Sequence, residues 1–356
     1  LLLSLLTDFT NKDLNLSDMR NAAGLITAHY RKNGYFVAQA YLPAQDIKEG
    51  IVTITVIEGQ IGQVEIRSEK NARLPDKTIR DILDINARQG ALIRKDNIER
   101  GLLLVNDLPG VEVQSTLKPG ATVGTADLVM ELKKKFPLSA GVDFDNYGNR
   151  YTGYYRGGAS VSVNNLAGYG ESINIRALTS GNGLFYTRGA ITLPVGPLGT
   201  SAGIAYSYMT YRLGDDYESL GAKGSAHVAG VYVLHPFIRS RNLNLYGHGQ
   251  YDHKDLQDRI DSAGEVTNRG LHTGTFALNL DARDELSGGG ASNATLSLVC
   301  GQLNIRSDDA RQTDATTAQT DGNYGKALLN LSRLQRLPAN FSFYAAARGQ
   351  LAFNNL

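Results

Sequence analysis

From Leu138 to the end of the chain, segments of about ten residues alternate small or apolar side chains with polar ones. In one of them the first set is Ile173, Ile175 and Ala177, and the second set is Ser172, Asn174 and Arg176. Because successive side chains of a strand point to opposite faces of its sheet, each segment predicts a strand with one dry and one wet face. About eleven such segments follow one another, so the sequence predicts an all-β domain over residues 137–356.

Two architectures fit this alternation: a soluble sandwich with a dry core, and a membrane barrel with lipid outside and water inside. Segments of about ten residues suit a tilted membrane strand, whereas soluble strands centre near five or six. The dry positions hold many Ala and Gly, which fits a lipid-facing wall better than an interdigitated core. Tyrosines near the predicted strand ends fit an aromatic girdle, although the chain has no Trp. We therefore predict a transmembrane antiparallel β-barrel.

The predicted connections between these strands differ on the two sides. Compact connections with Pro or Gly are expected near Ala167, Pro194–Gly199, His235–Asn242, Asp284–Asn293 and Gln335–Ala339. The alternate connections are charged and lengthen toward the C-terminus, near Asn146, Ser180, Gly214–Gly224, Lys254–Asn268 and Ser307–Gly322. Short turns on one side and long loops on the other are typical of bacterial outer-membrane barrels.

The residues before the barrel contain an internal repeat with an offset of 76. Gly34 falls on Gly110, Pro43 falls on Pro119, and the preceding segments both have helical periods. The second copy reads as strand, helix, helix, strand, strand. We therefore predict two βααββ domains, over residues 1–60 and 61–136, and expect the first to lack its opening strand. We also expect the chain to stop before the barrel closes, since such barrels have an even number of strands.

Composition narrows the range of functions. A formal net charge of +1 gives no reason to expect nucleic acid or acidic ligands. The single cysteine, Cys300, excludes a disulfide within the chain and a cysteine-based zinc cluster. The histidines show no metal spacing, and no strand and helix flank the Gly288-Gly289-Gly290 turn as a nucleotide-binding loop would require. We expect no enzyme activity, no metal, no cofactor and no nucleotide.

Several short stretches resemble a known family in their order and spacing. In the first repeat they are Gly34-Tyr35, Ala40-Tyr41-Leu42-Pro43 and Val56-Ile57-Glu58-Gly59. At the start of the barrel they are Asp145, Asn146, Tyr147 and Gly148, followed by Tyr151, Thr152 and Gly153. Together they resemble the outer-membrane transporters of two-partner secretion (type V secretion, the TpsB family of haemolysin secretion and activation). In that family two POTRA domains precede the barrel.

The resemblance implies a barrel of about sixteen strands, of which about eleven are present here. It implies POTRA domains in the periplasm and a barrel in the outer-membrane lipid. It also implies that the protein captures the N-terminal secretion domain of a large exoprotein, of the haemolysin or adhesin kind, and exports it. Two alternatives remain open at this point: a barrel-assembly factor of the same superfamily and, less favoured, a soluble β-rich adhesin.

The first repeat contains the predicted surface for the exported partner. A strand from Phe36 to Leu42 at a sheet edge would accept an extended peptide by β-augmentation. A groove between this strand and the helix carrying Ile26 and Tyr30 would take apolar side chains. The predicted contact residues are Ile26, Tyr30, Phe36, Val37, Ala38, Gln39, Ala40, Tyr41 and Leu42.

Overall fold

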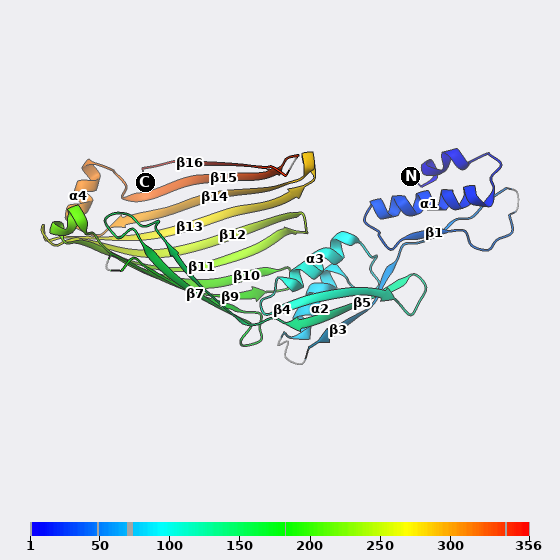
Figure 1. Ribbon diagram of the computed structural model, residues 1–356, viewed down its shortest axis with the longest axis horizontal. Coiled ribbons are helices and arrows are strands. Elements are labelled where there is room, and N and C mark those ends of the chain that lie inside the picture. The colour runs from blue at the N-terminus through cyan, green and yellow to red at the C-terminus, as the bar shows by residue number, and fades with distance from the viewer. Residues whose placement is uncertain (1, 48–49, 70–73, 182, 339, 356) are drawn as a thin grey trace. The chain divides into compact units, whose positions relative to one another are not determined.

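The structure is a computed structural model that describes all residues except 1, 48–49, 70–73, 182, 339 and 356 (Figure 1). Apart from two short stretches, the chain divides into a helical unit that ends at Lys134 and a sheet unit that begins at Lys135. Among the described residues, no helix combines the length and the apolarity that a membrane crossing requires.

The second repeat has the predicted βααββ order. Its elements are β3 (Gln60–Ser68), α2 (Asp76–Asn86), α3 (Lys95–Asn106), β4 (Val111–Pro119) and β5 (Thr125–Lys134). In the sheet, β5 lies in the middle, parallel to β3 and antiparallel to β4. Ile79 and Ile82 of α2 are buried, as are Leu128 and Met130 of β5, so both sides of the domain contribute to one core.

The first repeat has the corresponding elements η1 (Leu3–Phe9), α1 (Leu16–Lys32), β1 (Gln39–Tyr41) and β2 (Thr55–Ile57). A capping box starts α1, because the Asn15 side chain accepts from the Asp18 backbone N–H and the Asp18 carboxylate accepts from that of Asn15, both at 3.0 Å. Adding the offset of 76 places α1 on α3, β1 on β4 and β2 on β5, as the repeat predicts.

The strands of the first repeat are shorter than predicted. The predicted strand from Phe36 to Leu42 is reduced to Gln39–Tyr41. Helix α1 ends at Gly34, which has φ +90°. The Gly34 N–H donates to the Arg31 carbonyl, and the Tyr35 N–H donates to the Tyr30 carbonyl. A turn follows, in which the Ala38 N–H donates to the Tyr35 carbonyl. Residues 34–38 therefore complete the helix end and a turn, and only then does the chain become extended.

Next to the β1–β2 ladder, a side chain takes the place of backbone partners for Thr53. The amide of Gln45 accepts from the Thr53 N–H at 2.7 Å and donates to the Thr53 carbonyl at 2.8 Å. Because these backbone groups are satisfied by a side chain, the β1–β2 ladder stops at Tyr41 and Thr55.

The sheet unit contains the predicted eleven strands in one antiparallel sheet, with β6 and β16 at its two edges. Every strand pairs with its neighbours in sequence, which is the meander expected of an outer-membrane barrel. The strands are β6 (Leu138–Asp145), β7 (Arg156–Asn164), β8 (Ser172–Thr179), β9 (Leu184–Val195), β10 (Thr200–Arg212), β11 (Ala222–Arg239), β12 (Leu243–Ile260), β13 (Glu265–Asp284), β14 (Gly290–Ile305), β15 (Gly322–Arg336) and β16 (Ser342–Ala352).

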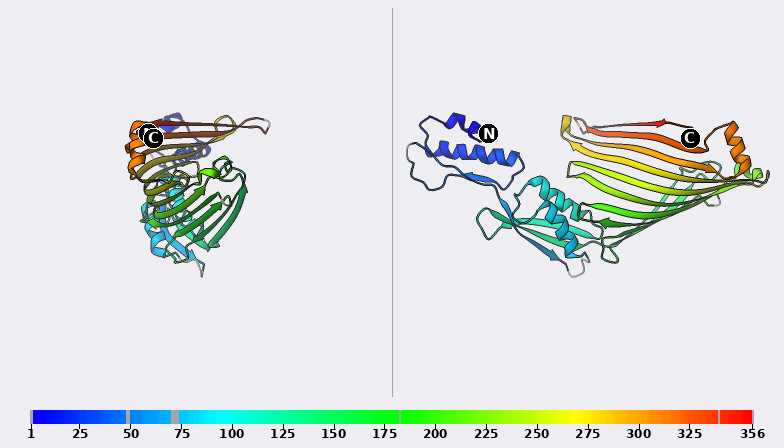
Figure 2. Two further views of the ribbon diagram at one scale, coloured as in Figure 1. Left: turned by 90° about the vertical axis from the view of Figure 1, so that its left-hand side faces the viewer. Right: turned by 180° about the vertical axis from the view of Figure 1, so that it is seen from behind.

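The two faces of this sheet have different chemistry, as the alternation predicts. On one face, here called the apolar face, Val231, Phe276 and Leu298 are 54%, 49% and 49% exposed. On the other, called the polar face, Ser207 and Thr273 are only 8% and 4% exposed. The sheet is curved (Figure 2). Because a curved sheet spreads side chains on its convex side and crowds them on its concave side, these exposed fractions identify the polar face as the concave one.

One predicted loop is wrong. The segment Lys254–Asn268 was expected to be a long connection, but β12 continues to Ile260 and β13 starts at Glu265. The charged residues there are held by neighbours on adjacent strands: Arg269 contacts Asp258 at 3.0 Å and Arg306 contacts Asp255 at 2.9 Å. On the same side of the sheet, the connection between β14 and β15 is long and contains α4 (Asp308–Thr316), as predicted.

Candidate functional site

The polar face is lined by side chains that are hydrogen-bonded across strands. Tyr211 donates to Asp258 at 2.7 Å, and the hydroxyls of Thr273 and Tyr324 are 2.7 Å apart. Asp258 also accepts from Arg269 of the next strand at 3.0 Å. These bonds fix large polar side chains against a concave wall, which is the arrangement expected beside a water-filled passage.

Positive charge gathers on the same face. The register aligns Arg176 of β8, Arg188 of β9 and Lys254 of β12 in one row across the sheet, with Ser207 and Val228 between them. Asp143 of β6 accepts from Arg176 at 3.0 Å. Charged side chains on a membrane strand are stable only where water or a partner reaches them, so this row indicates a hydrated interior.

The family motif at the start of the barrel forms the connection between β6 and β7. Asp145, at the end of β6, takes two hydrogen bonds from the guanidinium of Arg156, at 2.8 and 3.1 Å, and one from the Tyr147 N–H at 2.9 Å. Asn146 is exposed beside it, and the Tyr147 side chain is 81% exposed. A β-carbon on Gly148 would lie 1.9 Å from the Gly153 carbonyl oxygen, so only glycine fits there.

The rest of this motif ties three connections of the same rim together. The Tyr151 carbonyl accepts from the Gly214 N–H at 2.8 Å. The centroids of the Tyr151 and Tyr217 rings are 4.7 Å apart. The Thr152 carbonyl accepts from the Ser180 hydroxyl. Gly153 has φ +103°, a conformation that favours glycine. The motif residues therefore lie together and stabilise the rim.

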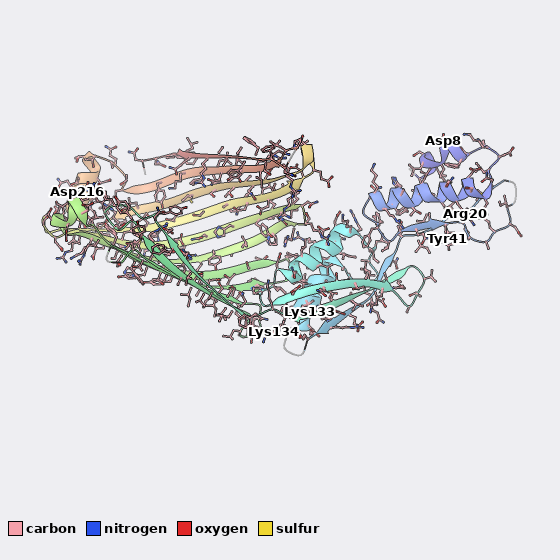
Figure 3. All side chains as sticks on the ribbon, viewed as in Figure 1. Asp8, Arg20, Tyr41, Lys133, Lys134 and Asp216 are labelled. Carbon is pink, nitrogen blue, oxygen red and sulfur yellow. The ribbon has the colours of Figure 1, made fainter. Side chains whose placement is uncertain are left out.

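An ion pair adds to this rim. Arg150 contacts Asp215 and, at 3.2 Å, Asp216, which Figure 3 labels in the connection between β10 and β11. The hydrogen bond from Arg150 lowers the pKa of Asp215. Both partners are about half exposed, so the pair contributes little stability by itself and mainly orients the connection.

In the first repeat, the predicted partner-binding residues divide into a buried and an exposed set. Ile26, Ala38 and Ala40 are 4%, 0% and 8% exposed and belong to the core of the repeat. Phe36 and Tyr41 are 39% and 40% exposed, and Tyr41 is labelled on β1 in Figure 3. Gln39 is also exposed, whereas Val37 and Leu42 are half-buried. A bound partner would therefore reach Phe36, Gln39 and Tyr41 first.

Tyr30 lies where the groove between α1 and the strands is predicted, and it is partly buried there. Its hydroxyl donates to Glu58 at 3.0 Å, and its ring meets that of Tyr35 edge-on, with 5.7 Å between the ring centroids. Burial, together with the hydrogen bond to Glu58, raises the pKa of Tyr30. The hydroxyl is therefore already satisfied, and Tyr30 packs against the core cluster of Ala23, Ile26 and Ala40.

The outer edge of β1 offers fewer backbone groups than predicted. The central residue, Ala40, directs its N–H away from β2 to the Thr27 hydroxyl at 2.9 Å. That hydroxyl in turn donates to the Ala23 carbonyl at 3.1 Å. An added strand would have to displace Thr27 before it could accept from Ala40.

Sequence reasoning missed a longer edge in the second repeat. β4 spans nine residues and pairs only with β5 among the described residues, so its other edge is open except where Asn106 accepts from the Val113 N–H at 3.2 Å. The offset of 76 was the available signal, because it places Gln39–Tyr41 on residues 115–117 of β4. The two repeats together thus present one short and one long strand edge.

Within the described part of the chain, no group of three or more His, Cys, Asp or Glu side chains is arranged to hold a metal ion. Cys300 is exposed and follows Leu296 and Leu298 in phase on the apolar face.

Comparison with known proteins gives two family matches. Residues 2–59 match the POTRA domain of ShlB type, and residues 124–356 match the haemolysin secretion/activation protein family ShlB/FhaC/HecB.

Individual relatives agree with these matches. The heme/hemopexin transporter protein HuxB of Haemophilus influenzae (strain 86-028NP) is 31% identical over 353 residues, which are 99% of this chain and 62% of HuxB. The outer membrane transporter CdiB of Escherichia coli O6:K15:H31 is 25% identical over 265 residues, 72% of this chain and 44% of that protein. The solved structure of CdiB from Escherichia coli superposes with a TM-score of 0.76 at 20% identity and covers all of this chain and 66% of that one. The chain thus spans about three fifths of the length of HuxB.

Proposed function

Because this chain belongs to the haemolysin secretion/activation protein family ShlB/FhaC/HecB, we propose that it exports a secreted partner protein through the outer membrane to the cell surface. The family places the sheet in the bacterial outer membrane and the POTRA-type repeats in the periplasm. The proposal includes no enzymatic step.

The polar face of the sheet is the observation that carries this proposal. It is concave, bears the cation row of Arg176, Arg188 and Lys254, and holds its tyrosines by hydrogen bonds across strands. A wall of this kind lets an unfolded polypeptide slide past without burying apolar side chains against it. Folding of the partner outside the cell would then supply the direction of transport.

Capture of the partner is proposed to begin at the first repeat. Phe36 and Tyr41 expose apolar rings beside β1, and Gln39 adds a polar group between them along the chain. An extended segment of the partner would lay alternate side chains on this surface. The open edge of β4 then offers a second, longer strand for the same segment to pair with.

Deletion of residues 1–60 tests this function. We expect export of the partner to fall to background while the barrel still inserts, because residues 1–60 belong to a compact unit separate from the sheet. The measurement is the amount of partner in the medium, with heat-modifiable migration of the barrel on gels as the control for insertion. Unchanged export would exclude capture by the first repeat. A loss of other outer-membrane barrels with normal export would instead favour a barrel-assembly role.

A finer test uses exposed residues of one repeat. The double substitution Phe36→Ala, Tyr41→Ala should lower export several-fold, since it removes both exposed rings. The matched control is Leu25→Ala, which removes an exposed apolar side chain from α1, is 45% exposed, and should leave export unchanged. Equal losses in both variants would contradict a specific surface at β1.

A further inference from the structure

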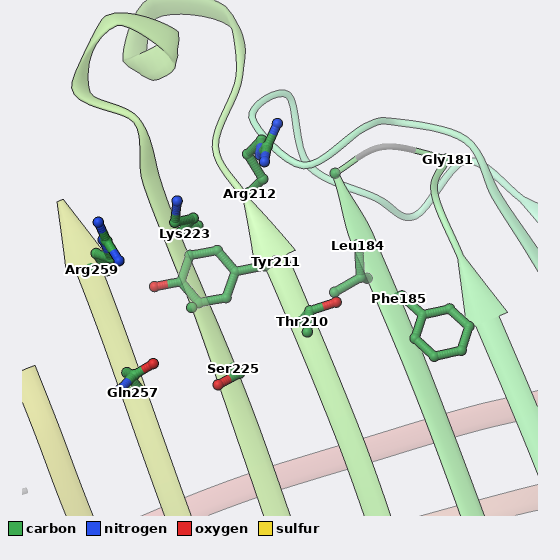
Figure 4. Close-up of a pocket in the computed structure, with 12 residues that line it drawn as sticks. Gly181, Leu184, Phe185, Thr210, Tyr211, Arg212, Lys223, Ser225, Gln257 and Arg259 are labelled. Atoms are coloured by element: carbon green, nitrogen blue, oxygen red, sulfur yellow. The ribbon is translucent and has the colours of Figure 1, made fainter. Parts of the chain in front are cut away.

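A hollow of about 600 Å³ lies at one rim of the sheet, on strands β9 to β12 (Figure 4). Its side chains are contributed by the ends of these strands, and Gly181 and Gly183 of the connection between β8 and β9 also line it. The charged and polar side chains that line it are Thr210, Arg212, Lys223, Ser225, Gln257 and Arg259. Three of these six are cations and none is an acid.

Strand alternation places these six side chains on the apolar face. Arg212 and Thr210 are in phase with Ile204, which is 59% exposed, and they are out of phase with Ser207. The register aligns Arg212 with Lys223 and Arg259 in one row across three strands, and it aligns Thr210 with Ser225 and Gln257 in the next. The hollow therefore opens to the lipid side of the barrel and not to the passage.

The rim that holds this hollow is the extracellular one. The chain enters the sheet from the periplasmic repeats at the start of β6, so the ends of β6, β8, β10 and β12 lie on the opposite side of the membrane. Arg212 is at the end of β10 and Arg259 is near the end of β12. The cation row therefore lies at the outer ends of these strands, on the side of the outer leaflet.

The charges at this rim do not cancel. Asp261, in the turn after β12, accepts from Lys223 at 2.7 Å and from Arg259 at 2.6 Å. Arg212 has no ion pair with any residue that the structure describes. Several neighbouring acids are engaged elsewhere: Asp215 and Asp216 with Arg150, Asp255, on the same face, with Arg306, and Asp258, on the polar face, with Arg269. Three cations thus face one carboxylate, which leaves a net positive charge in the hollow.

The same face continues into an apolar hollow toward the middle of the membrane. It measures about 660 Å³ and is lined by Ile191, Leu193, Val195, Ile204, Val231 and Val233 on the same strands. Between the two hollows lie Tyr206, Tyr208 and His227, with the Tyr206 hydroxyl 2.7 Å from the His227 ring nitrogen. A cation row, an aromatic row and an apolar groove thus follow one another along the strands.

We propose that this surface binds a phosphorylated lipid of the outer leaflet, with phosphate on the row of Arg212, Lys223 and Arg259 and an acyl chain in the apolar groove. Guanidinium and ammonium groups form strong hydrogen bonds with phosphate oxygens, and the hydroxyls and amide below them suit a sugar or glycerol backbone. Adjacent strands are about 4.8 Å apart, so the row spans about 10 Å, enough for more than one phosphate group. The inference rests on the outer-membrane location and not on the export of a partner.

The test titrates the intact protein in detergent with phosphorylated lipid A, or with the same lipid after removal of its phosphates, and counts bound lipid by native mass spectrometry. The triple variant Arg212→Gln, Lys223→Gln, Arg259→Gln should bind the phosphorylated lipid about tenfold more weakly. Its binding of the dephosphorylated lipid should stay as in the wild type. The matched control is Lys133→Gln, Lys134→Gln, Lys135→Gln, which removes the same charge from exposed positions outside the sheet and should have no effect.

If both triple variants lost the same affinity for the phosphorylated lipid, the effect would come from net charge alone, and the proposed site would be wrong. Equal binding of the two lipids by the wild type would also overturn it, as would displacement of the lipid by inorganic diphosphate at the same concentration, which would indicate an ion site. Asp261→Asn provides a second test of lipid binding if the triple variant fails to fold. It removes the carboxylate that engages Lys223 and Arg259 and should tighten phosphorylated lipid binding several-fold, and an unchanged affinity would contradict the proposal.

Discussion

The two faces of the eleven-stranded sheet are built from the same strands and the same hydrogen-bond ladder, yet their side chains behave differently. On the apolar face, Val231 and Phe276 project separately and are about half exposed. On the polar face, Tyr232 lies across the neighbouring strand over Gly203, and its hydroxyl is 2.5 Å from that of Thr192. One face is suited to contact lipid, and the other is a polar surface whose side chains are hydrogen-bonded across strands.

This difference shows which face of such a sheet requires particular residues. The apolar face needs only small or apolar groups at alternate positions, because lipid chains adapt to its shape. The polar face needs particular partners, such as a glycine under each of three large tyrosines. Tyr211 over Gly224 and Tyr324 over Gly301 repeat the arrangement of Tyr232 and Gly203.

The largest expected effect comes from placing a charge on the apolar face, compared with keeping one on the polar face. Val231→Arg puts a guanidinium near the middle of the apolar face and should destabilise the inserted barrel by about 2–4 kcal/mol. Lys254→Arg keeps the existing charge on the polar face and should be tolerated. The temperature at which heat-modifiable migration is lost measures both. Equal stability of the two variants would contradict the assignment of the faces.

A glycine comparison should give a smaller effect. In Gly203→Ala the new β-carbon would lie 2.4 Å from the Tyr232 ring and 2.6 Å from the Ile191 carbonyl, so the variant should lose about 1–3 kcal/mol. Gly189→Ala, on the neighbouring strand and the apolar face, meets no atom within 4 Å and should be close to neutral. The same heat-modification assay compares them, and a loss in Gly189→Ala as large as in Gly203→Ala would show that the apolar face is equally packed.

The smallest effect is expected from single hydroxyls. Tyr211→Phe removes the hydrogen bond to Asp258 on the polar face and should lower stability by about 1 kcal/mol. Tyr206→Phe removes an exposed hydrogen bond to His227 on the apolar face and should cost less. Urea unfolding in detergent resolves this difference. A larger loss in Tyr206→Phe would reverse the expected order of the two faces.

Much of this architecture was predictable from periodicity. Eleven strands, the alternation of the two faces and the offset of 76 all follow from side-chain patterns with a period of two or 3.6 residues. The family resemblance is confirmed by the matches over residues 2–59 and 124–356. The domain limits at 60 and 136 and the role of the partner-binding residues stay predictions.

The errors arose where distant side chains decide the structure. Charges at Asp255 and Asp258 indicated a loop, but Arg306 and Arg269 on neighbouring strands hold them on β12. The strand expected from Phe36 to Leu42 was shortened by the helix end at Gly34 and by Gln45 bonding to Thr53. Pattern reading considers one strand at a time, whereas these contacts join residues that only the fold brings together.

The central claim of the proposed export is that the partner passes along the polar face, and cysteine cross-linking tests it directly. Cys300 is first replaced by Ser, and a single cysteine is then placed at Ser207 on the polar face or at Ala229 on the apolar face. The partner is fused to a folded, disulfide-bonded domain that stalls it in transit, and it carries a cysteine in the stalled segment. We predict a cross-link from Ser207→Cys and none from Ala229→Cys. Cross-links of equal yield from both positions, or from Ala229→Cys alone, would contradict export along the polar face of this barrel.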